Sequence, residues 1–102
     1  MAYYGCVKIE WDKAKDESNV QKHGLSFNEA KELFLSGDDY LEIYDLEHSN
    51  SEDRFIAIGR IVRGVAVVVY TERLDERLRI ISARFATKRE QQMYRDHLGT
   101  KL

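Results

Sequence analysis

Residues 54–86 read RFIAIGRIVRGVAVVVYTERLDERLRIISARFA, and this stretch decides the fold. Two runs rich in β-branched and other apolar residues, 54–62 and 65–72, are separated only by Arg63-Gly64. A two-residue interruption of this kind is typical of a β-hairpin. The second run is almost entirely apolar, which is typical of a strand buried on both faces. The stretch therefore predicts the centre of an antiparallel sheet.

The strand pattern continues on both sides of this hairpin. A polar turn at 73–76 leads into a further strand predicted over 77–86, and the segment 40–45 alternates as a strand before a polar connection. Consecutive strands with short connections pair side by side, so the sequence predicts a four-stranded antiparallel β-sheet in meander order. The alternation of apolar residues also permits a short strand at 6–10.

Capping signals predict three helices around this sheet. The first has an N-cap residue before it and a glycine after it, and the other two open with capping boxes. The residues that supply these signals are Asp12, Gly24, Ser26 with Glu29, and Thr87 with Glu90. The helices are expected over 12–23, 26–37 and 87–98. Two N-terminal helices, a sheet and a C-terminal helix make an α+β fold.

Length and composition fit one soluble domain over residues 1–102, with 43% apolar and 33% charged residues. No apolar run approaches the roughly 20 residues that cross a bilayer. The first residues lack the basic and apolar regions of a signal peptide, so a cytoplasmic location is expected. The single cysteine, Cys6, cannot form an internal disulfide. Neither metal-ligand spacing nor a glycine-rich phosphate loop is present, so no metal or cofactor is expected.

Charge is divided unevenly along the chain. Residues 1–53 carry five lysines against 13 acidic residues, a net charge of −8. Residues 54–102 carry all nine arginines and two lysines against five acidic residues, a net charge of +6. Arginine binds phosphate through two parallel hydrogen bonds, so the second half predicts a face that binds a polyanion. The alternative is that the arginines only keep exposed strand positions soluble.

Strand alternation assigns the arginines to faces of the sheet. In the last strand one face would carry Leu78, Ile80, Ser82 and Arg84, and the other Arg79, Ile81, Ala83 and Phe85. Helices must cover one face, and the other would stay partly open. Which face is covered stays undecided at this stage. The open face is expected to collect Arg79 or Arg84, together with Arg60, Glu72 and Tyr70.

A longer series of residues carries a more specific resemblance. It comprises Trp11-Asp12, Lys15, Asn19, Lys22-His23-Gly24, Phe27, Ala30, Phe34, Asp45, His48-Ser49, Glu52, Arg54, Gly59, Thr71-Glu72-Arg73, Arg79-Ile80-Ile81-Ser82-Ala83-Arg84, Ala86, Glu90 and Tyr94. In this order and spacing the series resembles the BrnT family, toxins of bacterial type II toxin–antitoxin systems. The resemblance covers residues 9–95, and it implies a RelE-like ribonuclease toxin fold.

The resemblance also implies a function. The chain would be a metal-independent endoribonuclease that cleaves RNA and inhibits translation. A BrnA-type antitoxin with a ribbon-helix-helix DNA-binding part would neutralise it, so the chain would meet DNA only through that complex. A heterotetramer of two toxins and two antitoxins is expected on the resemblance alone. The basic half would then be the target of the antitoxin as well as of RNA.

Metal-independent cleavage by the ribose 2′-hydroxyl needs a base, cations that stabilise the charged phosphorane, and an acid for the leaving 5′-oxygen. The resemblance and the residue types together nominate six site residues and one helper. They are Arg84 and Arg79 for the phosphate, Glu72 or His48 for the base, and Lys22, His23 or Tyr94 for a proton or a contact.

Each candidate also has a structural alternative. His23 precedes a helix-ending glycine and could cap carbonyl groups, His48 with Ser49 could organise a turn, and an arginine near a glutamate is more often an ion pair. For the whole chain, the competing hypothesis is a catalytically inactive toxin-fold module that acts as co-repressor with a DNA-binding antitoxin. A plain DNA-binding domain is a weaker hypothesis, because no predicted helix is basic enough to fill a major groove.

Overall fold

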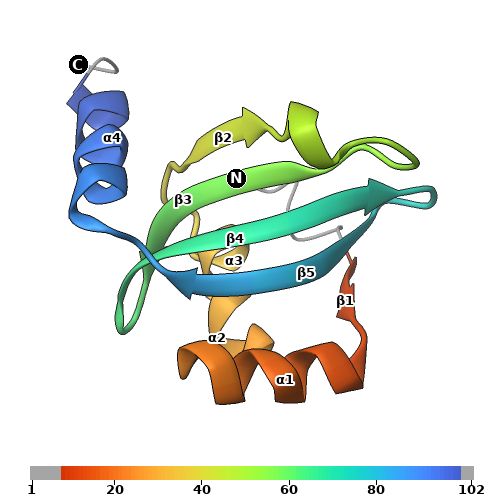
Figure 1. Cartoon of the computed structure of the whole chain (residues 1–102). Helices are drawn as coiled ribbons and strands as arrows, with labels where there is room; N and C mark the ends of the chain where they lie inside the picture. Colours follow the sequence, from red (N-terminus) through yellow and green to blue (C-terminus); the bar gives the residue numbers. More distant parts are fainter. Residues whose placement is uncertain (1–7, 100–102) are drawn as a thin grey trace.

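The computed structural model describes residues 8–99, so Cys6 lies outside the described residues. The elements follow the order β1 (Lys8–Trp11), α1 (Lys13–His23), α2 (Phe27–Ala30), α3 (Glu32–Leu35), β2 (Leu41–Tyr44), η2 (Leu46–His48), β3 (Phe55–Ile61), β4 (Gly64–Arg73), β5 (Arg77–Phe85) and α4 (Lys88–Gly99). The strands form one mixed sheet with the order β1-β5-β4-β3-β2 (Figure 1). No helix in the described part of the chain is long and apolar enough to span a bilayer.

The predicted meander is confirmed, because β2, β3, β4 and β5 pair antiparallel in sequence order. The prediction of a four-stranded, wholly antiparallel sheet is wrong. The described part of the segment predicted as a short strand at 6–10 belongs to β1 (Lys8–Trp11), which pairs parallel with β5 and adds a fifth strand. In this pairing Lys8 lies opposite Arg77, and Trp11 opposite Ile80. Periodicity reveals a strand but not its partner, so this long-range pairing could not be predicted.

The hairpin between β3 and β4 is confirmed, with its turn shifted by one residue. Ile61 pairs with Gly64, so the loop consists of Val62 and Arg63. Gly64 has a φ of 143°, a conformation that residues with a side chain rarely adopt. The glycine therefore opens β4 rather than closing the turn.

The helix signals are also largely confirmed. Asp12 caps the start of α1, and Gly24, at a φ of 68°, ends it. The capping box predicted at the start of the second helix is present. The helix expected over 26–37 is instead divided at Lys31 into α2 and α3. Capping signals thus located the helix start correctly but did not reveal the break inside it.

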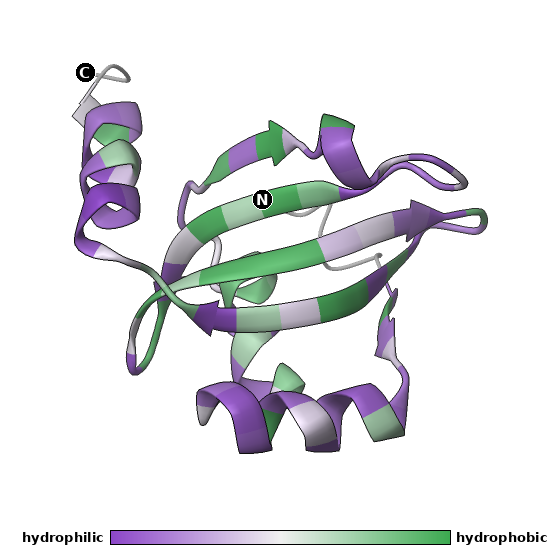
Figure 2. Cartoon of the chain, in the orientation of Figure 1, coloured by the Kyte–Doolittle hydropathy of each residue, from purple (hydrophilic) through white to green (hydrophobic). Residues whose placement is uncertain are grey.

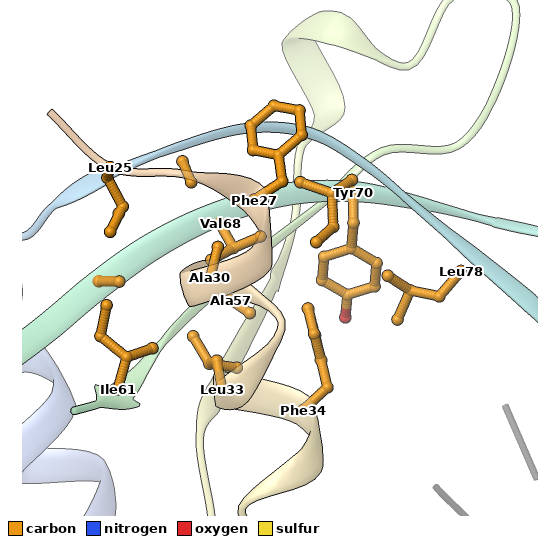
Figure 3. Close-up of a cluster of buried hydrophobic side chains, with 13 residues drawn as sticks. Leu25, Phe27, Ala30, Leu33, Phe34, Ala57, Ile61, Val68, Tyr70 and Leu78 are labelled. Atoms are coloured by element: carbon orange, nitrogen blue, oxygen red, sulfur yellow. The ribbon is translucent and has the colours of Figure 1, made fainter. Parts of the chain in front are cut away.

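The main core lies between the sheet and the N-terminal helices. In the view of Figure 1, α3 lies behind the sheet and α2 lies between the sheet and α1. Tyr70, Phe27 and Phe34 are the largest fully buried side chains (Figure 3), and Phe34 meets Tyr70 edge-on with ring centroids 4.9 Å apart. A Cβ atom at Gly59 would come within 3.0 Å of the Leu33 Cγ. The missing side chain therefore lets α3 pack closely on β3.

A β-bulge in β5 alters the predicted faces. Val69 of β4 pairs with Ser82, and the next residue, Tyr70, pairs with Ile80. Ile81 is therefore an extra residue without a partner on β4. An extra residue of this kind shifts the alternation of side chains by one position. Residues before and after Ile81 consequently follow opposite parities.

The bulge places both arginines of the RIISAR motif on the open face. The β5 residues that face the helices are Leu78, Ile80, Ala83 and Phe85. Arg79 and Arg84 therefore share the opposite face with Arg60, and the predicted grouping of Arg84 with Leu78 and Ile80 is wrong. Tyr70 is buried in the main core, and Glu72 follows the same parity, so neither belongs to the open face.

The edge of β5 beyond β1 is closed by a side chain rather than by a strand. Asn19 of α1 donates from Nδ2 to the Ala83 carbonyl at 2.7 Å and to the Leu25 carbonyl at 2.8 Å. Its Oδ1 accepts from the Ala83 amide at 3.1 Å. Asn19 is only 5% exposed. One amide side chain therefore continues the strand pairing next to the bulge and docks α1 on the sheet.

α4 covers one end of the open face. It opens with the predicted capping box, in which Thr87 and Glu90 exchange hydrogen bonds. Tyr94 packs with Ile58 and Val67 of the sheet, and this burial raises the pKa of Tyr94. Toward β1 no α-helix of the described residues lies over this face (Figure 1). Figure 2 shows β4 changing from hydrophobic along its middle to hydrophilic near that end.

Candidate functional site

A row of polar residues crosses the end of the open face near β1, over which no α-helix of the described residues lies (Figure 1). The strand register places Thr71 of β4 beside Arg79 of β5, and Arg79 beside Glu10 of β1. Extending the β3–β4 register by one residue puts Arg54 beside Thr71. The Asp45 amide donates to the Arg54 carbonyl at 2.8 Å, which adds the end of β2. We call Asp45, Arg54, Thr71, Arg79 and Glu10 the transverse row.

η2 folds His48 back onto the row. Its Nδ1 lies 3.0 Å from Asp45 Oδ2 and 3.1 Å from Oδ1. The Asp45 side chain is 14% exposed, whereas that of His48 is 63% exposed. A carboxylate at Nδ1 favours the tautomer that carries the proton there, which leaves Nε2 able to accept a proton. The pair therefore has the arrangement of an oriented general base.

Ser49 holds this corner of the molecule together. Its hydroxyl donates to the Asp45 carbonyl at 2.5 Å and accepts from the Arg54 amide at 3.0 Å. The same hydroxyl thus links the end of β2 to the start of β3. This bridge gives a physical reason for the spacing of Asp45, His48-Ser49 and Arg54 in the sequence.

At the other end of the row, one carboxylate is shared between two arginines. Glu10 accepts from Arg79 at 3.3 Å and from Arg77 at 3.3 Å. The arginine side chains are 35% and 41% exposed, respectively. Long, partly exposed ion pairs of this kind contribute at most about 1 kcal/mol. A substrate phosphate can therefore compete with Glu10 for Arg79.

Arg54 differs from the other arginines of this end. Its acidic neighbour Asp45 contacts His48, and no carboxylate among residues 8–99 forms an ion pair with the Arg54 guanidinium. The Arg54 Nε is buried and has no hydrogen-bond partner in the described structure. The row therefore contains one cation that forms no ion pair with any carboxylate of the described residues.

A groove of about 560 Å³ opens beside the row at the end of β4. It is lined by Glu52, Asp53, Thr71, Glu72, Arg73, Leu74 and Arg77. Glu72 therefore lies close to the row but on the other face of its strand. Arg73 reaches Glu52 across the groove at 3.7 Å. Among the described residues, no group of three or more His, Cys, Asp or Glu side chains is placed to hold a metal ion.

Arg84 lies at the opposite end of β5 and has a tightly bound partner. Its two terminal nitrogens donate to the two oxygens of Glu90 at 2.7 and 2.8 Å. The hydrogen bonds from Arg84 are the main reason why the pKa of Glu90 falls to about 2. The same bonds raise the pKa of Arg84. Since Glu90 also accepts from the Thr87 amide at 2.9 Å, this pair joins β5 to the start of α4.

Lys22 and His23 are the last residues of α1, and both are exposed. The adjacent Gly24 carbonyl accepts from Arg63 in the β3–β4 turn at 3.0 Å. That turn lies at the end of the sheet away from β1 (Figure 1). The six nominated residues are therefore not brought together. His48 and Arg79 lie beside or within the row and Glu72 in the groove, whereas Arg84, Lys22 and His23 lie toward the other end.

Comparison with known proteins identifies the family. The model of the family described as "Ribonuclease toxin, BrnT, of type II toxin-antitoxin system" matches residues 11–90. The chain belongs to the BrnT toxin family. Membership of a type II toxin–antitoxin family implies an antitoxin partner for this BrnT protein. Curated protein sequences give no significant match.

A solved structure supports the same assignment. The crystal structure of the ribonuclease toxin BrnT of Brucella abortus, at 1.1 Å resolution, is 31% identical in sequence to this chain and superposes with a TM-score of 0.62. The match covers 80% of this chain and 99% of the Brucella chain. The resemblance inferred from the sequence motifs is therefore confirmed, and so is a BrnT-like α+β fold.

Three charged residues of the transverse row were not nominated from the sequence. Asp45 and Arg54 belong to the series that carries the BrnT resemblance, so their fixed spacing from His48 was a usable signal. Glu10 left a weaker signal, since it alternates with the apolar residues of β1. Only the parallel pairing of β1 with β5 brings Glu10 to Arg79.

Proposed function

We propose that this BrnT protein is an endoribonuclease toxin that cleaves RNA without a metal ion and thereby inhibits translation. The observation that carries the proposal is the His48–Asp45 pair beside the two arginines of the transverse row, Arg54 and Arg79. Cleavage by the ribose's own hydroxyl requires a group that takes a proton and cations that bind phosphate. This end of the open face supplies both.

In the proposed reaction, His48 Nε2 takes the proton of the 2′-hydroxyl, and the 2′-oxygen attacks the adjacent phosphorus. The bond from phosphorus to the 5′-oxygen breaks, which leaves a 2′,3′-cyclic phosphate and a 5′-hydroxyl end. The departing oxygen takes a proton from solvent. Asp45 stabilises the imidazolium that forms, and Arg79 leaves Glu10 to stabilise the charge on the phosphorane.

The proposal extends to the partner. We expect a BrnA-type antitoxin with a ribbon-helix-helix part, which binds DNA for the complex and joins two toxins in a heterotetramer. Family membership supports an antitoxin, and the arginine-bearing end of the open face offers it an inhibitory site. An acidic or apolar segment over the row would exclude RNA and complement its charge. The toxin would act in the cytoplasm, where translated RNA is present.

The direct test is cleavage of a defined RNA by the purified chain in the presence of EDTA. We expect a 2′,3′-cyclic phosphate product and no cut at a position that carries a 2′-deoxyribose. His48→Ala should slow cleavage by about 10²–10⁴-fold, the usual contribution of a general base. Expression without antitoxin should arrest growth. The proposal fails if neither free RNA nor RNA on translating ribosomes is cut.

An inactive module that acts as co-repressor is the second candidate. It is favoured by one observation, that Arg79 and Arg84 each contact a carboxylate of their own chain. This alternative predicts no cleavage and no growth arrest, but tighter operator binding by the antitoxin when the chain is present. Measuring RNA cleavage and operator binding on the same preparation separates the two functions.

A further inference from the structure

The geometry points to a phosphodiester-binding slot above Thr71, between Arg54 and Arg79. The inference rests on the proposed ribonuclease function and states where the substrate backbone is held. Arg54, which sequence reasoning did not nominate, supplies one side of the slot. Three observations support it. They are the missing hydrogen-bond partner of the Arg54 Nε in the described part of the chain, the register of the strands, and the contacts that the two carboxylates of the row make with other side chains.

The first observation concerns the Nε atom of the Arg54 guanidinium. Its Nε has no access to solvent and no hydrogen-bond partner in the described part of the chain. Buried polar groups are almost always hydrogen-bonded, because a lost bond costs free energy. A ligand that draws the half-buried side chain toward the face relieves this cost. Phosphate suits the need, since it accepts from Nε and a terminal nitrogen at the same time.

The second observation is the strand register. Arg54 and Arg79 flank Thr71 on adjacent strands, so their backbones are two strand spacings, about 10 Å, apart. Two long side chains at this separation can meet one phosphodiester between them. Thr71 is short, and its hydroxyl already donates to the Asp53 carbonyl at 2.6 Å. It therefore forms a low floor that neither blocks nor competes for the phosphate.

The third observation is that both carboxylates of the transverse row, Asp45 and Glu10, contact other side chains. Asp45 contacts His48, and Glu10 is shared by Arg77 and Arg79 on the far side of the row. An anion above Thr71 therefore meets two cations before either carboxylate. Asp45 and His48 adjoin Arg54 on the side of β2. A phosphate in the slot consequently has the proposed base next to it.

Binding of inorganic phosphate and of an uncleavable 2′-deoxydinucleotide tests the slot without chemistry. The probe is the Nε–H signal of Arg54 in NMR spectra of ¹⁵N-labelled protein during titration. We expect this signal to shift to saturation. Arg54→Lys should weaken binding about tenfold, because a point charge cannot replace the planar fork. Arg60→Lys is the matched control, since Arg60 is exposed on the same face of β3, the strand that directly follows Arg54, and it should change affinity less than twofold.

Equal affinity in the wild type, Arg54→Lys and Arg60→Lys overturns the slot, and so does binding that leaves the Arg54 signal unmoved. Thermal unfolding of each variant verifies that comparisons are made between folded proteins. The slot and the proposed function can fail separately. Normal RNA binding and cleavage by Arg54→Lys overturns the slot alone. Phosphate bound at Arg54 by a chain that cuts no RNA overturns the function alone.

Discussion

Arg79 and Arg84 share a strand and, because of the bulge at Ile81, a face, yet their environments differ. Arg84 makes two short hydrogen bonds to Glu90, at 2.7 and 2.8 Å. Arg79 makes one contact of 3.3 Å with Glu10, a carboxylate that a second arginine also uses. The two ends of the open face thus hold the same residue type in two different ways.

The difference lies in what else each carboxylate does. Glu90 closes the capping box of α4, so its bonds to Arg84 fix the helix to the sheet. Glu10 holds no helix and divides its charge between two partly exposed arginines. An arginine bound through both nitrogens to a helix cap is structural, whereas one in a weak shared contact is available to a ligand. The number of arginines in a motif cannot distinguish these roles.

The largest expected effect is on RNA cleavage at the transverse row. Arg79→Ala should lower kcat/KM for a defined RNA by about 10²–10³-fold, because one preorganised donor to the phosphorane is lost. Its free energy of unfolding should change by less than about 1 kcal/mol. Arg84→Ala should instead lower the free energy of unfolding and leave kcat/KM of the folded protein nearly unchanged. The distinction between the ends is wrong if Arg84→Ala, compared at equal folded concentration, loses as much cleavage as Arg79→Ala.

The parts of the fold that were predictable depend on residues close together in the sequence. The N-cap at Asp12, the glycine at 24 and both capping boxes involve residues within one helical turn, and all of them are present. The meander likewise joins strands that follow one another in the sequence. Periodicity and capping report such local geometry directly.

The parts that could not be predicted depend on distant partners. RIISAR interrupts its alternation at the adjacent apolar residues Ile80 and Ile81, but such a pair also fits a regular strand that is buried on both faces. The bulge is identified only when β5 is set against β4 and when Asn19 bonds to Ala83. The contact of Glu10 with Arg79 likewise needs the pairing of the first strand with the last. The site was therefore predictable in residue type but not in arrangement.

The second prediction concerns the packing at the Arg84 end. Asn19→Ala should lower the free energy of unfolding by about 2–4 kcal/mol, because it leaves the amide and carbonyl of Ala83 without partners. Lys15→Ala, at an exposed position one turn earlier on α1, is the control and should cost less than about 0.5 kcal/mol. Urea unfolding measures both. Equal, small losses would show that α1 does not hold the bulged edge.

The third prediction compares the two ion pairs directly. A double-mutant cycle on Arg84 and Glu90, with Arg84→Met and Glu90→Gln, should give a coupling of about 1–2 kcal/mol, as expected for a two-bond pair. The matching cycle with Arg79→Met and Glu10→Gln should give less than about 0.5 kcal/mol. Urea midpoints measure both cycles. Similar couplings would remove the energetic difference on which the assignment of roles depends.

The smallest expected effect is the pH dependence of the Arg84 end. The pKa of Glu90 is about 2 in the folded protein against an ordinary value of 4.5, so between these values the unfolded chain binds more protons. The pair therefore contributes fully above pH 4.5 and loses its contribution as pH falls through about 2. Because Arg84 is 42% exposed, solvent screening reduces the loss to about 1 kcal/mol. Unfolding free energies of wild type and Glu90→Gln should converge over this range, and a constant gap would contradict the pairing.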